Sequence, residues 1–339
     1  MDIQTAIKSA IAGQDLSQLD MSAVMNQIMT GECTPAQIGG FLVGMRMKGE
    51  TVDEITAAAM VMRELSTRVN VDLDNLVDTC GTGGDASGSF NISTASAIVT
   101  AAAGAHVAKH GNRSVSGATG SADVLEAAGV NLNITPEQVG DCISQVGVGF
   151  MFAQKHHSAM RHAIGPRKEM AVRTIFNVLG PLTNPASAPN QVIGVFDKAL
   201  VEPIARVLGQ LGSRHVMVAH SEDGMDEVSV SAVTHIAELK DGDVRTYSVS
   251  PSDFGLELSN IAALKVETVE QSLAVIQAVL ANISGPARDI VCVNAGAAIY
   301  VSGVTDSWQA GVKMAQSVIA DGKAAETLQK LVEKSNSYE

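Results

Sequence analysis

LVDTCGTGGDASGSFNIST, residues 76–94, joins a short apolar run to a helix through a glycine-rich loop. Two units of this kind follow each other: strand 76–80 with helix 94–103, and strand 105–108 with helix 122–128. Strands that alternate with helices predict a mostly parallel sheet with helices on both of its faces. Ligands bind such sheets at the carboxyl ends of the strands, which is where both glycine-rich loops fall.

The alternation continues along the chain. Further strands are expected at 192–196, 216–219 and 290–294, and further helices at 200–211, 269–282 and 309–321. Asp241-Gly242-Asp243 separates two apolar runs and predicts a hairpin turn. We therefore interpret residues 71–339 as one large α/β domain.

The first seventy residues have a helical pattern instead. Three expected helices each begin at an N-cap residue: Ser17, Thr34 and Thr51. Thr34 and Thr51 also have the glutamine or glutamate, three residues later, that completes a capping box. Glycines at 39, 40 and 44 lie inside the second helix, where each costs about 1 kcal/mol relative to alanine. Close helix packing, within one subunit or between two, would explain them.

The composition excludes several classes of protein. Of the 339 residues, 46% are hydrophobic and 17% are charged, which is the balance of a folded globular protein. The formal net charge of −13 disfavours general nucleic-acid binding. The most apolar stretch, 95–108, is too short and too interrupted to span a membrane. Residues 1–13 lack the pattern of a signal peptide.

The four cysteines, at 33, 80, 142 and 292, are far apart and form no CxxC pair. Neither a zinc site nor a redox motif is therefore predicted. We interpret them as buried free thiols of a protein in a reducing cytoplasm.

The loop after the first strand has the chemistry of an anion site. Its glycines allow backbone N–H groups to curl around an anion, and the N-terminus of the next helix adds free N–H groups and partial positive charge. Short polar side chains at the same place add donors: Ser89, Asn91, Ser93 and Thr94. The pattern is neither a Walker loop nor a dinucleotide motif, and it predicts a pyrophosphate site. A plain glycine turn with Asn91 or Ser93 as an N-cap is the simpler alternative.

The second loop, 109–121, opens with Lys109-His110-Gly111-Asn112-Arg113. It brings two cations and several hydroxyl groups to another helix N-terminus. Because the chain as a whole is acidic, this local positive charge favours phosphate binding over a merely solvated basic loop. Such a loop could close over a substrate.

Together these motifs resemble the signatures of the anthranilate phosphoribosyltransferase family of tryptophan biosynthesis. The matching segments run in order along nearly the whole chain: 78–85, 109–113, 120–123, 173–185 and 224–227. The resemblance implies a glycosyltransferase that moves the 5-phosphoribosyl group from phosphoribosyl pyrophosphate to the amine of anthranilate. The products would be N-(5-phosphoribosyl)anthranilate and pyrophosphate.

The resemblance also implies two substrate sites. The phosphoribosyl pyrophosphate site would comprise Gly81, Gly83, Gly84, Asp85, Ser89, Asn91, Ser93, Thr94, Lys109, His110, Gly111, Asn112, Arg113, Ser116, Gly117 and Ser121. The anthranilate site would comprise Arg167 and Asn112, the Gly81 backbone, and a pocket lined by His110, His157 and Pro181. For His157 a surface or N-cap role is an equally good interpretation. No side chain is assigned as an essential base, and Lys109, Arg113 and metal would stabilise the transition state.

A magnesium site is the third implication. Asp226 and Glu227 follow an expected strand, and Mg²⁺ prefers one or two carboxylates together with substrate oxygens. The sequence pattern alone would favour an acidic surface turn. The resemblance instead assigns Asp226, Glu227 and Ser93 to magnesium, with two ions per subunit.

The family fold is a small helical domain joined to a larger α/β domain, as in nucleoside phosphorylases. We therefore expect residues 1–70 to form a helical domain that helices within 164–182 rejoin, and a homodimer through that domain. The sequence departs from the family pattern at 117–119, at Gln154 and at Ser158. These departures concern the phosphate contacts and the anthranilate channel rather than the reaction.

Two other functions share this fold. A pyrimidine nucleoside phosphorylase would use phosphate instead of releasing pyrophosphate, and the segments 111–113 and 173–185 favour the transferase. A nucleic-acid-binding relative is expected to carry a basic surface, which the net charge of −13 opposes.

Overall fold

The computed structural model describes residues 1–85, 87–113 and 119–338. Within them, seven strands form one sheet in the order β3-β2-β1-β4-β5-β6-β7. The strands are β1 (Leu76–Gly81), β2 (His106–Gly111), β3 (Val148–Phe152), β4 (Asn190–Gly194), β5 (His215–Ser221), β6 (Thr234–Lys240) and β7 (Asp243–Val249). β1 to β5 pair in parallel, and β6 and β7 extend the sheet as the predicted antiparallel hairpin. The expected mostly parallel sheet is confirmed.

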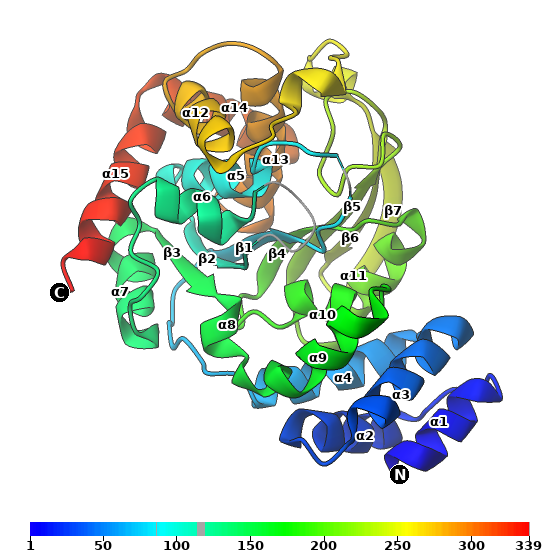
Figure 1. Ribbon diagram of the computed structural model, residues 1–339. Helices are drawn as coiled ribbons and strands as arrows, with labels where there is room; N and C mark the ends of the chain where they lie inside the picture. The colour runs from blue at the N-terminus through cyan, green and yellow to red at the C-terminus, as the bar shows by residue number, and fades with distance from the viewer. Residues whose placement is uncertain (86, 114–118, 339) are drawn as a thin grey trace.

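Four helices form the smaller lobe at the N-terminus (Figure 1): α1 (Ile3–Ile11), α2 (Gln18–Thr30), α3 (Pro35–Lys48) and α4 (Val52–Glu64). The three predicted N-caps are present, and Thr34 and Thr51 complete their capping boxes. A Cβ atom at Gly44 would lie 3.1 Å from the Cβ atom of Ala10. This glycine therefore allows close packing of α3 on α1 within the chain.

Eleven α-helices in the described residues belong to the remainder of the chain: α5 (Ile92–Ala102), α6 (Ser121–Ala127), α7 (Pro136–Val146), α8 (Ala153–His156), α9 (Arg161–Met170), α10 (Phe176–Leu182), α11 (Val201–Gln210), α12 (Val269–Leu280), α13 (Pro286–Val301), α14 (Trp308–Ala320) and α15 (Lys323–Asn336). Four 3₁₀ turns join them: η1 (Ser158–Met160), η2 (Lys198–Leu200), η3 (Pro251–Phe254) and η4 (Ile261–Leu264). α5 and α13 pack on one face of the sheet, and α7 and α11 pack on the other. The small helical lobe and the larger α/β lobe are the predicted architecture.

The prediction of a strand at residues 290–294 is wrong. These residues lie inside α13, in which eleven of sixteen residues are buried. A helix surrounded by α5, α14 and the sheet is apolar on most sides, so its sequence has no amphipathic period to separate it from a buried strand.

Two helices from the middle of the chain contact the N-terminal helices. α9 packs against α2 and α3, and α10 contacts α4.

All four cysteines are free thiols, with Cys142 and Cys292 buried and Cys33 and Cys80 half-buried. In the described parts of the chain, no helix is long and apolar enough to cross a membrane.

Candidate functional site

The two glycine-rich loops leave adjacent parallel strands, β1 and β2, at the same edge of the sheet. Between the first loop and α5, Asn91 caps the helix, because its Oδ1 atom accepts a hydrogen bond of 3.2 Å from the Thr94 N–H. The backbone N–H of Asn91 donates in turn to Ser272 Oγ at 3.0 Å. Ser89 pairs with Lys265 in an isolated antiparallel bridge. The N-terminus of α5 is thus fixed beside the loop from both sides.

The acidic loop that carries Asp226 lies against the ends of β1 and β4. A Cβ atom at Gly81 would lie 2.6 Å from Asp226 Oδ2, and one at Gly194 would lie 1.4 Å from the carbonyl oxygen of Asp226. Only glycine at these two positions leaves room for so close an approach. The Gly83 N–H donates to Asp226 Oδ2 at 2.8 Å. The structure therefore brings the first glycine loop and the acidic loop into direct contact.

Lys109, from β2, is a buried cation below the first loop. Its Nζ atom donates to the carbonyl oxygen of Thr79 at 2.6 Å and to Ser93 Oγ at 3.2 Å. Burial lowers the pKa of Lys109, and the charges of Asp78 and Glu227 oppose that shift. The amine is therefore held between a buried carboxylate on one side and the acidic loop on the other.

Asp78 anchors this arrangement from inside the sheet. Its Oδ2 atom accepts a hydrogen bond of 2.7 Å from Asn184 Nδ2, and its Oδ1 atom accepts one of 3.1 Å from the His110 N–H. Burial raises the pKa of Asp78, while the Lys109 charge lowers it. Asp78 and Asn184 lie in matched motifs that are far apart in the sequence, and the structure shows that they fix the second loop relative to the first.

Three carboxylates concentrate negative charge at the acidic loop. Burial, and then the charge of Asp85, raises the pKa of Asp226 to about 7. Burial, and then the charge of Asp226, raises the pKa of Glu227 well above its ordinary value, although Lys109 acts in the opposite direction. Like charges in a half-buried site repel, and a bound cation would relieve that repulsion.

The donor set fits Mg²⁺. Among the described residues, no group of three or more His, Cys, Asp or Glu side chains forms a complete metal cage. Mg²⁺ is usually held by one or two carboxylates and retains oxygen ligands from water and substrate. Two carboxylates with the Ser93 hydroxyl nearby are such an incomplete set.

Asn294 of α13 supports the acidic loop, although the sequence pattern did not point to it. Its Oδ1 atom accepts a hydrogen bond of 2.9 Å from the Val228 N–H, and its Nδ2 atom donates one of 2.9 Å to the Val228 carbonyl oxygen. Asn294 is buried, so these bonds fix the residue that follows Glu227. The available signal was an amide side chain within an apolar run.

His110 and His157 form a buried pair whose ring centroids are 5.1 Å apart. Neither Nε2 atom has a hydrogen-bond partner among the described residues. Burial, followed by His157, lowers the pKa of His110 well below its usual value, and burial lowers the pKa of His157 to about 4. Both rings are thus neutral at pH 7. The burial of His157 excludes the surface role that the sequence left open.

Two further residues predicted for anthranilate, Arg167 and Pro181, lie on α9 and α10. Arg167 is half-buried on α9, with its guanidinium carbon 5.3 Å from the centroid of the Phe176 ring. Pro181 is buried in α10, and its carbonyl oxygen accepts a hydrogen bond of 3.0 Å from Gln191 Nε2. Gln154, one of the departures from the family pattern, donates to Asn112 Oδ1 at 3.4 Å. Ser158 begins the turn η1.

The second predicted cation, Arg113, is engaged elsewhere. Its Nη1 atom lies 2.8 Å from both Asp123 and Glu126 of α6. Gly111 allows a close approach of Ser121, whose Oγ atom would lie 2.2 Å from a Cβ atom at Gly111. Of the other residues predicted for this loop, Ser116 and Gly117 lie outside the described residues. Lys109 is therefore positioned at the site, whereas Arg113 is ion-paired beside it.

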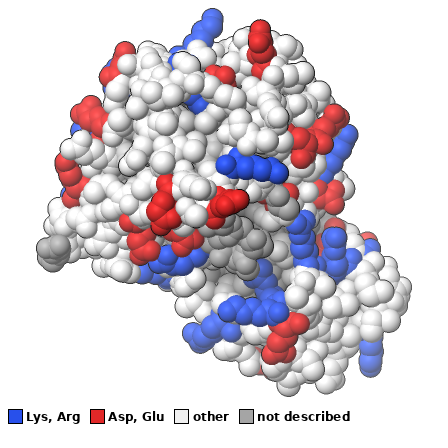
Figure 2. All heavy atoms as spheres, turned by 45° about the horizontal axis from the view of Figure 1, so that its top comes forward, with Lys and Arg blue, Asp and Glu red and all other residues white. Residues whose placement is uncertain are grey.

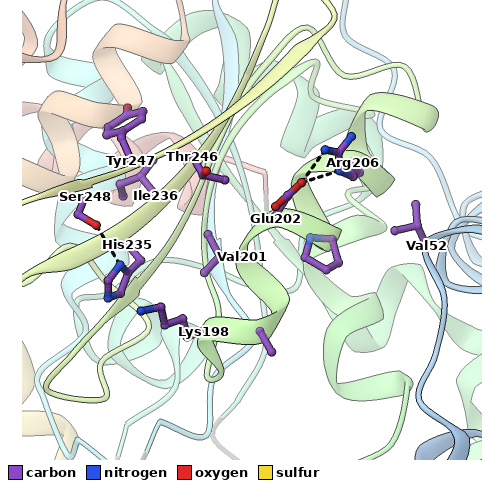
Figure 3. Close-up of a pocket in the computed structure, with 12 residues that line it drawn as sticks. Val52, Lys198, Val201, Glu202, Arg206, His235, Ile236, Thr246, Tyr247 and Ser248 are labelled. Carbon is purple, nitrogen blue, oxygen red and sulfur yellow. Dashed lines mark hydrogen bonds and ion pairs between the residues drawn. The ribbon is translucent and has the colours of Figure 1, made fainter.

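A separate cavity of about 750 Å³ lies between α11 and the β6–β7 hairpin (Figure 3). Its described lining includes Lys198, Glu202, Arg206, His235 and Tyr247, and none of the predicted site residues. Figure 2 shows basic and acidic side chains interspersed on the surface, with basic ones gathered where the two lobes meet.

Two family models match the chain. The model of the glycosyl transferase family, a/b domain, matches residues 73–325, and that of the glycosyl transferase family, helical bundle domain, matches residues 4–66. The anthranilate phosphoribosyltransferase of Thioalkalivibrio sulfidiphilus is 65% identical over 332 residues, which cover 98% of each chain. That of Methylococcus capsulatus is 56% identical over 338 residues, covering 100% of this chain and 99% of the relative.

Solved structures show the same fold. The anthranilate phosphoribosyltransferase of Thermus thermophilus superposes with a TM-score of 0.93 at 41% identity, covering 98% of this chain and 99% of the other. The enzyme of Saccharomyces cerevisiae, in complex with PRPP and Mg, superposes with a TM-score of 0.89 at 24% identity, covering 99% and 98%.

Proposed function

Because this chain belongs to the anthranilate phosphoribosyltransferase family, we propose that it transfers the 5-phosphoribosyl group from phosphoribosyl pyrophosphate to the amine of anthranilate. The products are N-(5-phosphoribosyl)anthranilate and pyrophosphate, in tryptophan biosynthesis. The observation that carries the proposal is the convergence of Lys109, the first glycine loop and the Asp226 loop at one edge of the sheet. A cation, free N–H groups and metal-binding carboxylates are the groups that a departing pyrophosphate requires.

The pyrophosphate would lie between the two glycine loops. Residues 81–94 offer backbone N–H groups and hydroxyls at the N-terminus of α5, and Lys109 lies below them with its amine on Ser93. Because Lys109 is fixed before substrate arrives, its charge costs no rearrangement as negative charge grows on the leaving group. The predicted contacts of Asp85, Ser89, Asn112, Arg113 and Ser121 complete this site in the proposal.

Asp226, Glu227 and Ser93 would hold magnesium, and we propose two ions per subunit. When bound, the metal supplies Lewis-acid neutralisation of pyrophosphate charge. The carboxylates of Asp226 and Glu227 present oxygen ligands from a loop that Gly81, Gly194 and Asn294 position.

Anthranilate would bind at the junction of the lobes. Arg167 is the cation for its carboxylate, with Asn112 and the Gly81 backbone nearby, and the neutral pair His110 and His157 with Pro181 forms the wall. An aniline nitrogen is already unprotonated at pH 7, so its lone pair is free to attack C1 of the ribose. The anomeric carbon becomes cationic in the transition state, so no strong base is required, and positioning supplies much of the rate.

We also propose the assembly and location. Residues 1–70, rejoined by α9 and α10, form the helical domain, and a homodimer forms through it. Exposed apolar side chains of this domain support the dimer: Ile11, Leu19, Val43, Met47 and Met60. Light scattering should give twice the 35.1 kDa of one chain at micromolar concentration, and the monomer mass would refute the dimer. The four free thiols support a reducing, cytoplasmic location.

The test is a fluorescence assay. Loss of anthranilate fluorescence should require both phosphoribosyl pyrophosphate and Mg²⁺, and one pyrophosphate should appear for each anthranilate consumed. A protein that leaves anthranilate unchanged and instead cleaves a pyrimidine nucleoside with phosphate would be the phosphorylase alternative.

A further inference from the structure

Arg173 connects the segment between α9 and α10 to the first glycine loop. Its Nη2 atom donates a hydrogen bond to the Gly84 carbonyl oxygen. Its guanidinium carbon also lies 4.0 Å from the centroid of the Phe196 ring, which follows β4. A planar guanidinium can stack flat on an aromatic face while the N–H groups at its edge donate, a geometry that a tetrahedral ammonium group does not reproduce.

The loop is held at three consecutive residues by three different elements. The Phe196 N–H donates to Thr82 Oγ1 at 3.0 Å, and the Gly83 N–H donates to Asp226 Oδ2 at 2.8 Å. Arg173 holds the third residue, Gly84, and stacks on the same Phe196 that holds the first. Arg173 and Phe196 therefore act on the loop as one unit.

The hydrogen bond to Gly84 fixes the direction of the next peptide group. In a trans peptide the C=O and N–H groups point in opposite directions, and the described residues contain no cis peptide bond. With the Gly84 carbonyl turned toward Arg173, the Asp85 N–H must point to the opposite side of the loop. Gly84 has φ +74°, a left-handed conformation that glycine adopts without the steric cost that other residues meet. The hydrogen bond from Arg173 adds an external hold on the direction of this N–H group.

We propose that Arg173 is a positioning residue that sets the first glycine loop for the pyrophosphate group of the substrate. This inference rests on the proposed function, because it names how that same site is held. Arg173 acts through the Gly84–Asp85 peptide and not by contact with phosphate. Arg167, six residues earlier on α9, serves the other substrate, so the two arginines should affect different substrates.

Calorimetric titration with phosphoribosyl pyrophosphate and Mg²⁺, in the absence of anthranilate, tests this without turnover. Arg173→Ala should raise Kd roughly tenfold, which corresponds to about 1.4 kcal/mol, and should leave the anthranilate KM within about twofold. Arg173→Lys should be as weak as the alanine variant, because it keeps the charge but not the stacked fork. Phe196→Leu should fall between these variants and wild type. Arg206→Ala removes another exposed arginine, ion-paired to Glu202 on α11, and should match wild type.

Three results would overturn the proposal. One is an unchanged Kd in Arg173→Ala. Another is recovery of wild-type Kd in Arg173→Lys, which would mean direct charge contact with phosphate. The third is an equal loss for anthranilate, which would mean general displacement of α9. Failure of the proposed function is distinguishable, since wild-type protein would then not consume anthranilate at all.

Discussion

Gly194→Ala should uncouple the acidic loop from the sheet without removing any catalytic group. The new Cβ atom would lie 1.4 Å from the carbonyl oxygen of Asp226, whereas ordinary contact begins at 3.4 Å. The Asp226 backbone must therefore move by about 2 Å, because backbone of β4 and of the loop face each other there and no flexible side chain can yield. A misplacement of 1 Å at a reactive centre can cost about 100-fold. We expect kcat/KM to fall at least 100-fold and the Mg²⁺ requirement to rise.

The protein should nevertheless fold. Overpacking typically costs about 1–3 kcal/mol, which lowers Tm by roughly 2–10 °C in a domain of this size. The assay is loss of anthranilate fluorescence over a Mg²⁺ titration, with calorimetric Tm measured in parallel. Gly165→Ala is the matched control, because a Cβ atom there would meet nothing within 4 Å, and it should keep wild-type activity. Wild-type kcat/KM and Mg²⁺ dependence in Gly194→Ala would refute this placement of Asp226.

Four further predictions concern individual side chains. Arg167→Ala should raise the anthranilate KM by the factor that corresponds to losing a contact of about 1.5–3 kcal/mol, with little change in the KM of phosphoribosyl pyrophosphate. An unchanged anthranilate KM would remove Arg167 from the pocket. Glu227→Gln should weaken Mg²⁺ dependence and leave Tm nearly unchanged, and activation by Mg²⁺ at the wild-type concentration would contradict the assignment. His110→Ala should keep most of kcat near pH 7, since burial holds the pKa of His110 below its usual range; a thousandfold loss of kcat at unchanged KM would identify it as a base. His157 has its pKa lowered to about 4, so only the unfolded chain takes up a proton as pH falls from about 6.5. The contribution of His157 to the free energy of unfolding is fully present above pH 6.5 and decreases by roughly 3 kcal/mol toward pH 4. Thermal unfolding at pH 4.5 should therefore show a smaller loss of stability in His157→Gln than in wild type. Equal losses in the two proteins would exclude this cause.

Local signals predicted the elements that begin and end sharply. Thr34 and Thr51 form capping boxes because their partners lie three residues away, and the hairpin at Asp241 needs only its own turn. The strands β1 and β2 were readable because each is a short apolar run that ends in a glycine loop. α13 has a start signal in Pro286 at its first position, but burial on most sides erased the periodicity that separates its run 290–294 from a buried strand.

The contacts that build the site were beyond the reach of sequence pattern. Asn184 lies 106 residues from Asp78, and Asn294 lies 66 residues from Val228. Each pair meets only because the chain crosses the sheet between its members. The resemblance to the family named Asp226, Glu227 and Arg167, but the glycine approach at Gly194 and the hold of Arg173 on Gly84 appear only when the strands are assembled.

The balance of charge at the site explains why the substrate would enter as its magnesium complex. Two cations are fixed there: Lys109, between Asp78 and Glu227, and Arg173, on the Gly84 carbonyl oxygen. Asp226 lies near a further carboxylate, Asp85, while Arg113 is paired with Asp123 and Glu126. Burial, and after it the neighbouring carboxylates, raises the pKa values of Asp226 and Glu227, so holding both groups ionised here costs free energy before any anion arrives. Bare pyrophosphate would add to the repulsion, whereas a metal-bound pyrophosphate would bring the missing positive charge with it. The carboxylates would therefore be required to select the metal complex, and the glycine loops to recognise the anion within it.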